Sequence, residues 1–296
     1  MARNPTKYIS GMIILRPKAQ FGNILFQYAF ARIISLRFGI SSIFVDRTFG
    51  GKILIELELA KELDVQPELY RVIFKHSTFL DKFTSIWSRF GLNGFSRLIQ
   101  TESLRVSIPA TVMKNVAIHG RFQSPQYWTG YEEIIREEIS TAIWKLAGKE
   151  ESKQIGVLGV HIRRGDYLEE RYKYSIGVLD VPFFEEAIRD AISKCKISNI
   201  ILFSDEVHHP DVVHLKDTFD CEVRSGEWLD DFCGIMECEF KIISNSTFSW
   251  WAAFLSEGLD SKKIWTPSPF TFSRSSEKDD DIIPQSWNAL QSKWMG

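Results

Sequence analysis

Apolar residues near the start of the chain change from a short continuous run to a helical spacing and back again. The run Met12–Leu15 leads into a loop that contains Pro, Gly and Asn, and residues 24–38 then carry apolar side chains at helical spacing until Gly39. A second short apolar run follows at Ser42–Val45. This order predicts a strand, a helix that ends at Gly39 and a parallel strand, the βαβ unit that opens an α/β domain.

The middle of the chain, from residue 56 to residue 144, has a mostly helical pattern and many aromatic residues. One short apolar run there, Val116–His119, predicts a strand. Basic residues are dispersed among aromatic ones from Lys75 to Arg105. Such a segment suits either peripheral contact with a membrane or an amphipathic helix packed on the core, and the second interpretation is favoured.

The charged stretch Lys149–Lys153 predicts a boundary between domains over residues 1–152 and 153–296. Beyond it, strand and helix patterns alternate regularly. Strands are predicted at residues 155–162, 199–203, 241–243 and 263–265, the last ended by Pro267, and helices at residues 182–194 and 248–255. The pattern therefore predicts a doubly wound α/β fold, and a final helix that packs back on the first domain is left open.

Composition excludes some classes of protein. The 296 residues are 44% hydrophobic and 25% charged, which suits a folded chain with a substantial core. With 36 basic and 38 acidic residues the formal charge is 36 − 38 = −2, so no nucleic-acid partner is expected. The four cysteines contain no CxxC pair, which suits reduced thiols in the cytoplasm.

Targeting signals are not expected. Residues 1–12 lack the apolar core of a signal peptide, and residues 24–34 are interrupted by Gln27 and Arg32 and are too short and polar to span a membrane. A cytoplasmic protein is therefore expected, with peripheral contact at the inner face of the membrane left open.

Three polar segments directly follow predicted strands: residues 161–167, residues 204–206 and residues 244–247. Ligands of open parallel sheets bind beyond the carboxyl ends of the strands, so these segments are the candidate site. The adjacent Arg163 and Arg164 suit bidentate binding of a diphosphate. A structural salt bridge, for instance with Asp166, explains the pair equally well. A cell-adhesion Arg-Gly-Asp tripeptide is discounted because the segment follows a buried strand.

The hydroxyls of Ser244, Ser246 and Thr247 fall at the start of a predicted helix, where negative charge is favoured. Ordinary N-capping is the alternative, and the coincidence with an arginine pair at the same edge of the sheet favours an anion site. The consecutive Trp250 and Trp251 cannot share a helix face, so one is expected in the core and the other in a groove or interface, and core packing of both is left open.

Two further clusters suggest metal chemistry only weakly. His208, His209 and His214 have no matching Cys or carboxylate pattern, and Pro210 between them indicates a turn in a surface loop rather than a zinc site. Asp279–Asp281 lies in a Ser-rich polar segment and is interpreted as a solvated loop. No metal ligand is therefore assigned.

Several blocks together resemble bacterial family 11 glycosyltransferases, the α-1,2-fucosyltransferases. They are HIRRGDY at 161–167, FSDE at 203–206, HGRFQSPQYW at 119–128 and SNSTFSWWAAFL at 244–255, with Met236, Cys238 and Ile243 upstream. FGNILFQYAFA at 21–31 resembles the family's glycine-rich opening, except that residues 18–21 replace the first glycines and Ile24 replaces the usual Gln.

The resemblance implies a GT-B architecture: two Rossmann-like domains with a cleft between them. It implies that the first domain faces the acceptor and the second binds GDP-fucose, without a divalent metal or other cofactor. The implied reaction is inverting transfer of L-fucose from GDP-β-L-fucose to a galactose-terminated oligosaccharide or lipid-linked glycan, forming an α-1,2 linkage in surface polysaccharide or O-antigen biosynthesis.

The resemblance also implies roles for individual residues. Arg163 is the first choice for the phosphate clamp, His161 for orientation, and Asp166 for the base or for a salt bridge to Arg164. The implied donor-binding residues are Arg163, Arg164, Asn23, Ser204, Asp205, Ser244, Asn245, Ser246, Thr247 and Phe248, and those on the acceptor side are Gln27, Gln123 and Trp250.

Three alternatives stay open at this point. One is a catalytically inactive protein that binds a nucleotide sugar, and another is a fucosyltransferase of different linkage. A Rossmann dehydrogenase is disfavoured because no GxGxxG follows a strand.

Overall fold

The computed structural model describes residues 9–47, 50–63, 95–99, 108, 110–112, 114–173, 175–272 and 280–295. Contacts between Cα atoms divide the chain into two units, Met1–Tyr131 and Glu132–Gly296. This division precedes the expected boundary at residues 152 and 153, because helix α4 (Glu132–Ala147) packs against helices α8 and α9 of the second unit.

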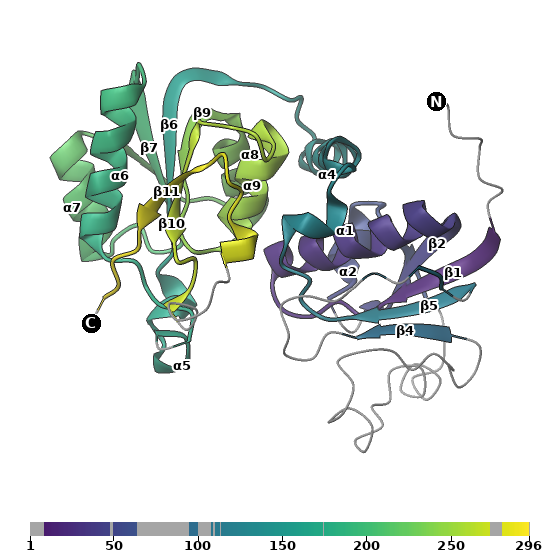
Figure 1. Cartoon of the computed structure of the whole chain (residues 1–296). Helices are drawn as coiled ribbons and strands as arrows, with labels where there is room; N and C mark the ends of the chain where they lie inside the picture. The colour runs from purple at the N-terminus through teal and green to yellow at the C-terminus, as the bar shows by residue number, and fades with distance from the viewer. Residues whose placement is uncertain are drawn as a thin grey trace. The chain divides into compact units, whose positions relative to one another are not determined.

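The first unit is a parallel sheet with a helix on its face (Figure 1). Its strand order is β3-β2-β1-β5-β4, with β1 Ile9–Leu15, β2 Ile40–Val45, β3 Lys61–Glu62, β4 Phe95–Ile99 and β5 Asn115–His119. Helix α1 (Phe21–Phe38) joins β1 to β2 and is buried along most of its length. Gly39 ends it at φ 65°, a left-handed conformation that glycine adopts without strain, as the sequence predicts. A short helix, α2 (Lys52–Glu56), follows β2.

The middle of the chain differs from its predicted helical pattern. Phe95–Ile99 is a strand, β4, whose five residues pair in register with β5 from Asn115 to His119. Pairing with a neighbouring strand overrides a local sequence pattern because each ladder position satisfies backbone groups that are otherwise unpaired. Most of the aromatic and basic segment from Lys75 to Arg105 lies outside the described residues.

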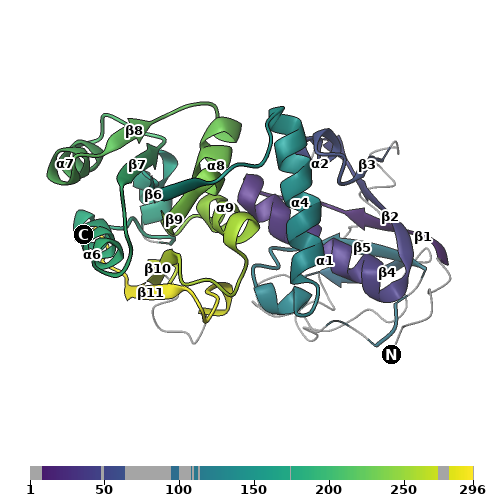
Figure 2. The same ribbon diagram turned by 90° about the horizontal axis from the view of Figure 1, so that it is seen from above.

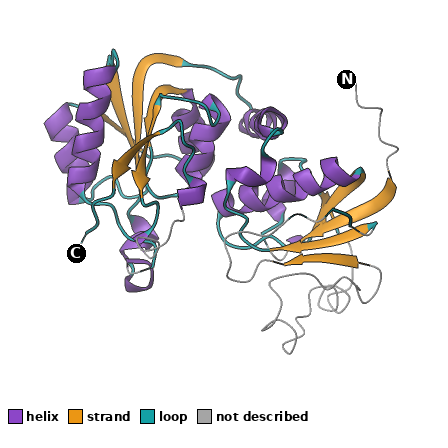
Figure 3. Ribbon diagram, viewed as in Figure 1, coloured by secondary structure: helices purple, strands orange, loops and turns teal. Residues whose placement is uncertain are grey.

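The second unit is a three-layer α/β/α structure (Figures 2 and 3). Its parallel sheet has the order β11-β10-β9-β6-β7-β8, with β6 Gln154–Ile162, β7 Asn199–Ser204, β8 Glu222–Arg224, β9 Cys238–Ile242, β10 Ile264–Ser268 and β11 Asn288–Gln291. One face carries α6 (Val181–Lys194) and α7 (Pro210–Phe219), and the other carries α8 (Trp228–Glu237) and α9 (Thr247–Glu257). A short helix, α5 (Glu170–Lys173), follows β6.

Two expectations for the second unit need correction. Pro267 does not end the predicted strand but lies inside β10, where it is paired with Leu290 of β11; β9 pairs only with Ile264 and Trp265. The last element of the described residues is the strand β11 rather than a helix. No helix within the described residues is long and apolar enough to cross a membrane.

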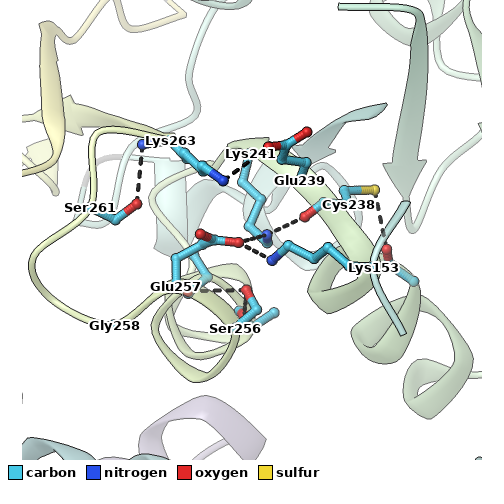
Figure 4. Close-up of polar contacts among 12 residues, drawn as sticks. Lys153, Cys238, Glu239, Lys241, Ser256, Glu257, Gly258, Ser261 and Lys263 are labelled. Carbon is cyan, nitrogen blue, oxygen red and sulfur yellow. Dashed lines mark hydrogen bonds and ion pairs between the residues drawn. The ribbon is translucent and has the colours of Figure 1, made fainter. Parts of the chain in front are cut away.

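The second unit contains a buried lysine, Lys241, that lies near charged side chains, among them Lys153 and Glu257 (Figure 4). Lys241 of β9 is fully buried, its Nζ donates to the carbonyl of Cys238, and Glu257 at the end of α9 lies 3.3 Å away. Glu257 also forms an ion pair with Lys153. Burial lowers the pKa of Lys241 to about 7, despite the opposing effect of Glu257.

Candidate functional site at the strand ends of the second unit

The polar segments predicted from the sequence meet where the order of strands reverses. The chain proceeds from β6 to β7 and β8 on one side and then returns to β9 on the other side of β6, so the switch point lies between β6 and β9. His161 at the end of β6 and Ser244 after β9 join these two strands, with 2.8 Å between His161 Nδ1 and Ser244 Oγ. The expected convergence of the segments is therefore present.

Arg163 is the partly exposed member of the arginine pair, with 23% of its side chain accessible. Its Nη2 donates to Asp166 Oδ1 at 2.6 Å, and its Nη1 lies 2.9 Å from Asp205 Oδ2. The guanidinium carbon also lies 5.4 Å from the ring centre of Tyr167. Nε is buried and has no hydrogen-bond partner among the described residues, so the guanidinium retains a donor.

Arg164 has the opposite environment, because its side chain is fully buried. Asp211 Oδ2 accepts from Arg164 Nε at 2.9 Å and lies 2.7 Å from Nη2. Burial lowers the pKa of Arg164, while the charge of Asp211 opposes that shift. A structural salt bridge was the alternative explanation of the arginine pair, and each arginine does form one. Asp166 pairs with Arg163, and Arg164 pairs with Asp211 rather than with Asp166.

Asp205, which follows β7, organises the turn after β6. Its Oδ1 accepts the backbone N–H of Arg164 at 2.9 Å, while its Oδ2 contacts Arg163. Gly165 makes this approach feasible, since a Cβ at that position would collide with the Asp205 carboxylate. Gly165 also has a positive φ of 22°. Ser204 is buried just before, and its Oγ accepts the N–H of Glu206 at 3.2 Å.

The segment after β9 supplies the N-terminus of α9. The Oγ of Ser246 accepts the N–H of Phe248 at 3.3 Å and caps the helix, while Thr247 and Phe248 are half-buried. The Asn245 side chain is turned away from this end: its Nδ2 donates to the carbonyls of Ile176 and Gly177 at 3.1 and 2.9 Å. Asn245 therefore holds the segment that follows the arginine turn.

His161 is buried beneath these groups and packs against Phe248, with 5.6 Å between the ring centres. Burial, assisted by the charge of Arg163, lowers the pKa of His161 to about 3. The imidazole is therefore neutral at physiological pH and serves as a hydrogen-bonding partner of Ser244 rather than as a source of positive charge.

Three predicted residues of the first unit lie together near the ends of β1 and β5. Gln27 is 1% exposed and forms two hydrogen bonds with the backbone of Lys18: Oε1 accepts its N–H at 2.9 Å and Nε2 donates to its carbonyl at 2.7 Å. Gln123 donates to the Oδ1 of the neighbouring Asn23. Gln27 therefore shapes the loop after β1, whereas Asn23 and Gln123 are half-buried.

Trp250 and Trp251 are both fully buried, so the expectation that one of them lines a groove is wrong. Trp250 Nε1 donates to the carbonyl of Ile282 at 2.8 Å, and its ring stacks on Phe254. The second face of α9 is not free because the segment around Ile282 covers it. Core packing thus accounts for both tryptophans.

The segment with the three histidines was expected to be a surface loop with a turn at Pro210, but it includes the start of a helix. Pro210 begins α7, with His209 as its N-cap, and His214 lies within the helix. No group of His, Cys, Asp and Glu in the described part of the chain is arranged to hold a metal ion. Of Asp279–Asp281, the first lies outside the described residues and the other two belong to a 3-10 turn.

Two residues of the site carried no assigned role in the sequence analysis. Tyr167, the last residue of the arginine motif, is buried, and its hydroxyl lies 3.4 Å from the carbonyl of Asn245. Asp211 holds the buried arginine. The sequence signals only that Asp211 lies in the first turn of a helix, because a Pro followed by an acidic residue is typical of that position. It does not signal the pairing with Arg164.

Three known proteins are similar to this chain in sequence or in fold. The Escherichia coli protein named alpha-1,2-colitosyltransferase is 26% identical over 208 residues, which cover 66% of this chain and 70% of that protein. The E. coli O-antigen biosynthesis glycosyltransferase WbnK is 34% identical over 105 residues, or 32% of this chain and 33% of WbnK. A mutant of Arabidopsis thaliana FUT1 in complex with GDP has a similar fold over 83% of this chain and 68% of that one, with a TM-score of 0.53 and 11% identity.

The match to a family is more extensive. The profile of "Glycosyl transferase family 11" matches residues 72–291, which include the arginine turn and the N-terminus of α9. It confirms the resemblance read from the sequence motifs. The chain therefore belongs to glycosyl transferase family 11, and its two parallel α/β units have the GT-B fold.

Proposed function

We propose that this glycosyltransferase moves L-fucose from GDP-β-L-fucose to the 2-hydroxyl of a galactose-terminated glycan. The acceptor is a free or lipid-linked oligosaccharide, and the product belongs to a surface polysaccharide or O antigen. Family membership supports glycosyl transfer, the name of the E. coli colitosyltransferase supports a 1,2 linkage, and the name of WbnK supports an O-antigen product. The choice of fucose rests on the motifs that resemble α-1,2-fucosyltransferases. We place the reaction in the cytoplasm or at the inner face of the membrane.

The observation that carries the proposal is the state of Arg163. It is a partly exposed guanidinium at the switch point of a parallel sheet, and its Nε lacks a partner among the described residues. A diphosphate at this position would accept a hydrogen bond from Arg163 once it has displaced a carboxylate, and it would lie near the N-terminus of α9. In this proposal Arg163 neutralises the departing GDP, and no divalent metal is required.

Arg163 is already engaged before the donor arrives. One guanidinium and the two carboxylates of Asp166 and Asp205 have a formal charge of 1 − 2 = −1. A diphosphate must therefore compete with a carboxylate for Arg163. We propose that it displaces Asp166, which lies one turn away, whereas Asp205 stays bonded to the Arg164 backbone.

The displaced Asp166 becomes available as the base. In the reaction, the bond between C1 of fucose and the β-phosphate oxygen breaks, and a bond forms between C1 and the acceptor oxygen on the opposite face. The acceptor proton passes to Asp166, and the negative charge on GDP is balanced by Arg163. Attack from the opposite face converts the β-linked donor into an α-linked product.

In this proposal the first unit binds the acceptor. The side-chain amides of Asn23 and Gln123 in that unit are half-buried and hydrogen-bonded to each other. Gln27 acts by holding the loop that follows β1. A nucleotide-sugar-binding protein without transferase activity would show the same donor site, so transfer must be measured directly.

The experiment compares wild type with Arg163→Ala, using GDP-fucose, GDP-colitose, GDP-mannose and UDP-galactose with galactose-terminated acceptors. The colitose donor is included because of the name of the E. coli relative. Transfer from GDP-fucose should persist in EDTA and fall by about 100- to 1000-fold in Arg163→Ala. Arg189→Ala, an exposed arginine of α6, is the matched control. Near-normal transfer by Arg163→Ala would refute the clamp, and loss of transfer in EDTA would refute metal independence.

A further inference from the structure

Arg164 is fixed by a carboxylate outside the arginine motif. Its Nε and Nη2 lie 2.9 and 2.7 Å from Asp211 Oδ2, and its Nη1 donates to the carbonyl of Arg163 at 2.9 Å. The guanidinium carbon lies 5.7 Å from the ring centre of Phe184. Nε and Nη1 of Arg164 thus donate to oxygens inside the protein, whereas Nη2 lies within ion-pair distance of Asp211 without forming a hydrogen bond among the described residues. The side chain has no exposed surface for a ligand.

These contacts act on a single peptide group. The carbonyl of Arg163 and the N–H of Arg164 belong to the same planar unit. The carbonyl accepts from the Arg164 guanidinium at 2.9 Å, and the N–H donates to Asp205 Oδ1 at 2.9 Å. Hydrogen bonds therefore fix both the carbonyl and the N–H of this peptide. The hydrogen bond to the carbonyl depends on Asp211, because Asp211 positions the Arg164 guanidinium.

Asp211 is itself rigidly placed. It lies in the first turn of α7, after Pro210, and the Nδ1 of the capping His209 accepts its N–H at 3.2 Å. A carboxylate in the first helical turn is favoured by the helix dipole. Its side chain is only 14% exposed, so it meets Arg164 rather than solvent.

We propose that Asp211 is a positioning residue: through Arg164 it fixes the Arg163–Arg164 peptide and thereby presents the Arg163 guanidinium to the donor diphosphate. The inference rests on the proposed role of Arg163. It gives the two arginines separate functions. Arg163 binds the ligand, and Arg164 connects the Arg163–Arg164 peptide to Asp211 on α7.

The first test is Asp211→Asn, which keeps the size of the side chain and one acceptor oxygen while removing the charge. We expect the Kd for GDP, measured by calorimetry, to rise by about 10- to 100-fold, because a displaced Arg163 loses hydrogen bonds to a charged ligand. Asp217→Asn on the same helix is exposed and should bind GDP as wild type does.

A second variant separates positioning from stability. Arg164→Met combined with Asp211→Leu removes both buried charges, and such replacements of a buried ion pair are tolerated by folding. We expect an unfolding midpoint close to that of wild type together with GDP binding as weak as in Asp211→Asn. This variant alone decides the question if Asp211→Asn does not fold.

The contrary outcomes are distinguishable. Recovery of GDP affinity along with stability in the double variant would reduce the pair to a structural salt bridge and overturn the inference. Wild-type affinity in Asp211→Asn would do the same while leaving the proposed function intact. Absence of GDP binding by wild type would overturn the proposed function, and the inference with it.

Discussion

His161 Nδ1 lies 2.8 Å from the hydroxyl of Ser244, and this hydrogen bond joins the ends of β6 and β9 at the switch point. The imidazole is buried, and its pKa is lowered to about 3 chiefly by that burial. The candidate site thus contains a buried neutral imidazole. The site is consequently sensitive to acid.

The free energy of unfolding should therefore decrease as the pH is lowered, and His161 should account for part of this decrease. The unfolded chain takes up this proton near pH 6.5 and the folded chain only near pH 3, so the unfolded state binds more protons between these values. The contribution is fully present above pH 6.5 and is lost as pH falls toward 3, at up to about 1.4 kcal/mol per pH unit. Urea unfolding of wild type and His161→Gln from pH 4 to 7 should show a flatter dependence in the variant. His208→Gln, at an exposed position, is the control, and parallel curves for wild type and His161→Gln would contradict this assignment.

Asp166→Asn should separate the two roles of Asp166. Because Asp166 competes with the diphosphate for Arg163 in our proposal, removing its charge should tighten GDP binding by about 5-fold, equivalent to ~1 kcal/mol for a partly exposed ion pair. Loss of the base should lower kcat by about 100-fold or more. Calorimetry and steady-state kinetics give both numbers. Weaker GDP binding would instead show that Asp166 only orients Arg163.

Trp250→Phe should affect stability rather than the acceptor. The variant keeps an aromatic ring near Phe254 and Trp287 but loses the hydrogen bond from Nε1 to the carbonyl of Ile282. We expect a loss of about 1–3 kcal/mol in the free energy of unfolding, because a buried carbonyl loses its donor. The KM for the acceptor should be unchanged. A raised KM at unchanged stability would restore the groove assignment.

Lys241 should make stability rise with pH in the alkaline range. Its folded-state pKa of about 7 is below the usual 10.5, so between these values the unfolded chain holds a proton that the folded chain has released. Stability therefore increases from about pH 7 toward 10.5, at up to about 1.4 kcal/mol per pH unit. Chemical unfolding of Lys241→Met should lack this rise, whereas Lys262→Met, at an exposed position, should retain it. A rise in Lys241→Met equal to that of wild type would contradict the assignment.

The sequence predicted the positions of the polar segments at strand ends, because strand ends follow from short-range patterns. β1, α1 and β2, and the strands β6, β7 and β9 with their polar ends, all lie where the apolar runs indicate. Partners in space were not predictable in the same way. Nothing in the arginine motif indicates that Arg164 meets Asp211, because that pair is 47 positions apart and depends on how α7 packs.

Burial was the other property that the motifs did not reveal. The sequence did not indicate how far each of the adjacent arginines is buried, yet one is partly exposed and the other has no accessible surface. The prediction that one of the two tryptophans lines a groove failed for a related reason, because a segment 32 positions further along covers the second face of α9. Likewise, β4 gains its conformation from pairing with β5 rather than from its own pattern.

The central claim is fucosyl transfer from GDP-fucose, and its most direct test is the structure of the product. Purified protein, GDP-β-L-fucose and a β-galactoside acceptor should be incubated with EDTA, and the product analysed by NMR. We predict one new sugar residue, an α-linked fucose on O2 of galactose, with release of GDP. Intact acceptor, or transfer from GDP-colitose but not from GDP-fucose, would contradict the claim.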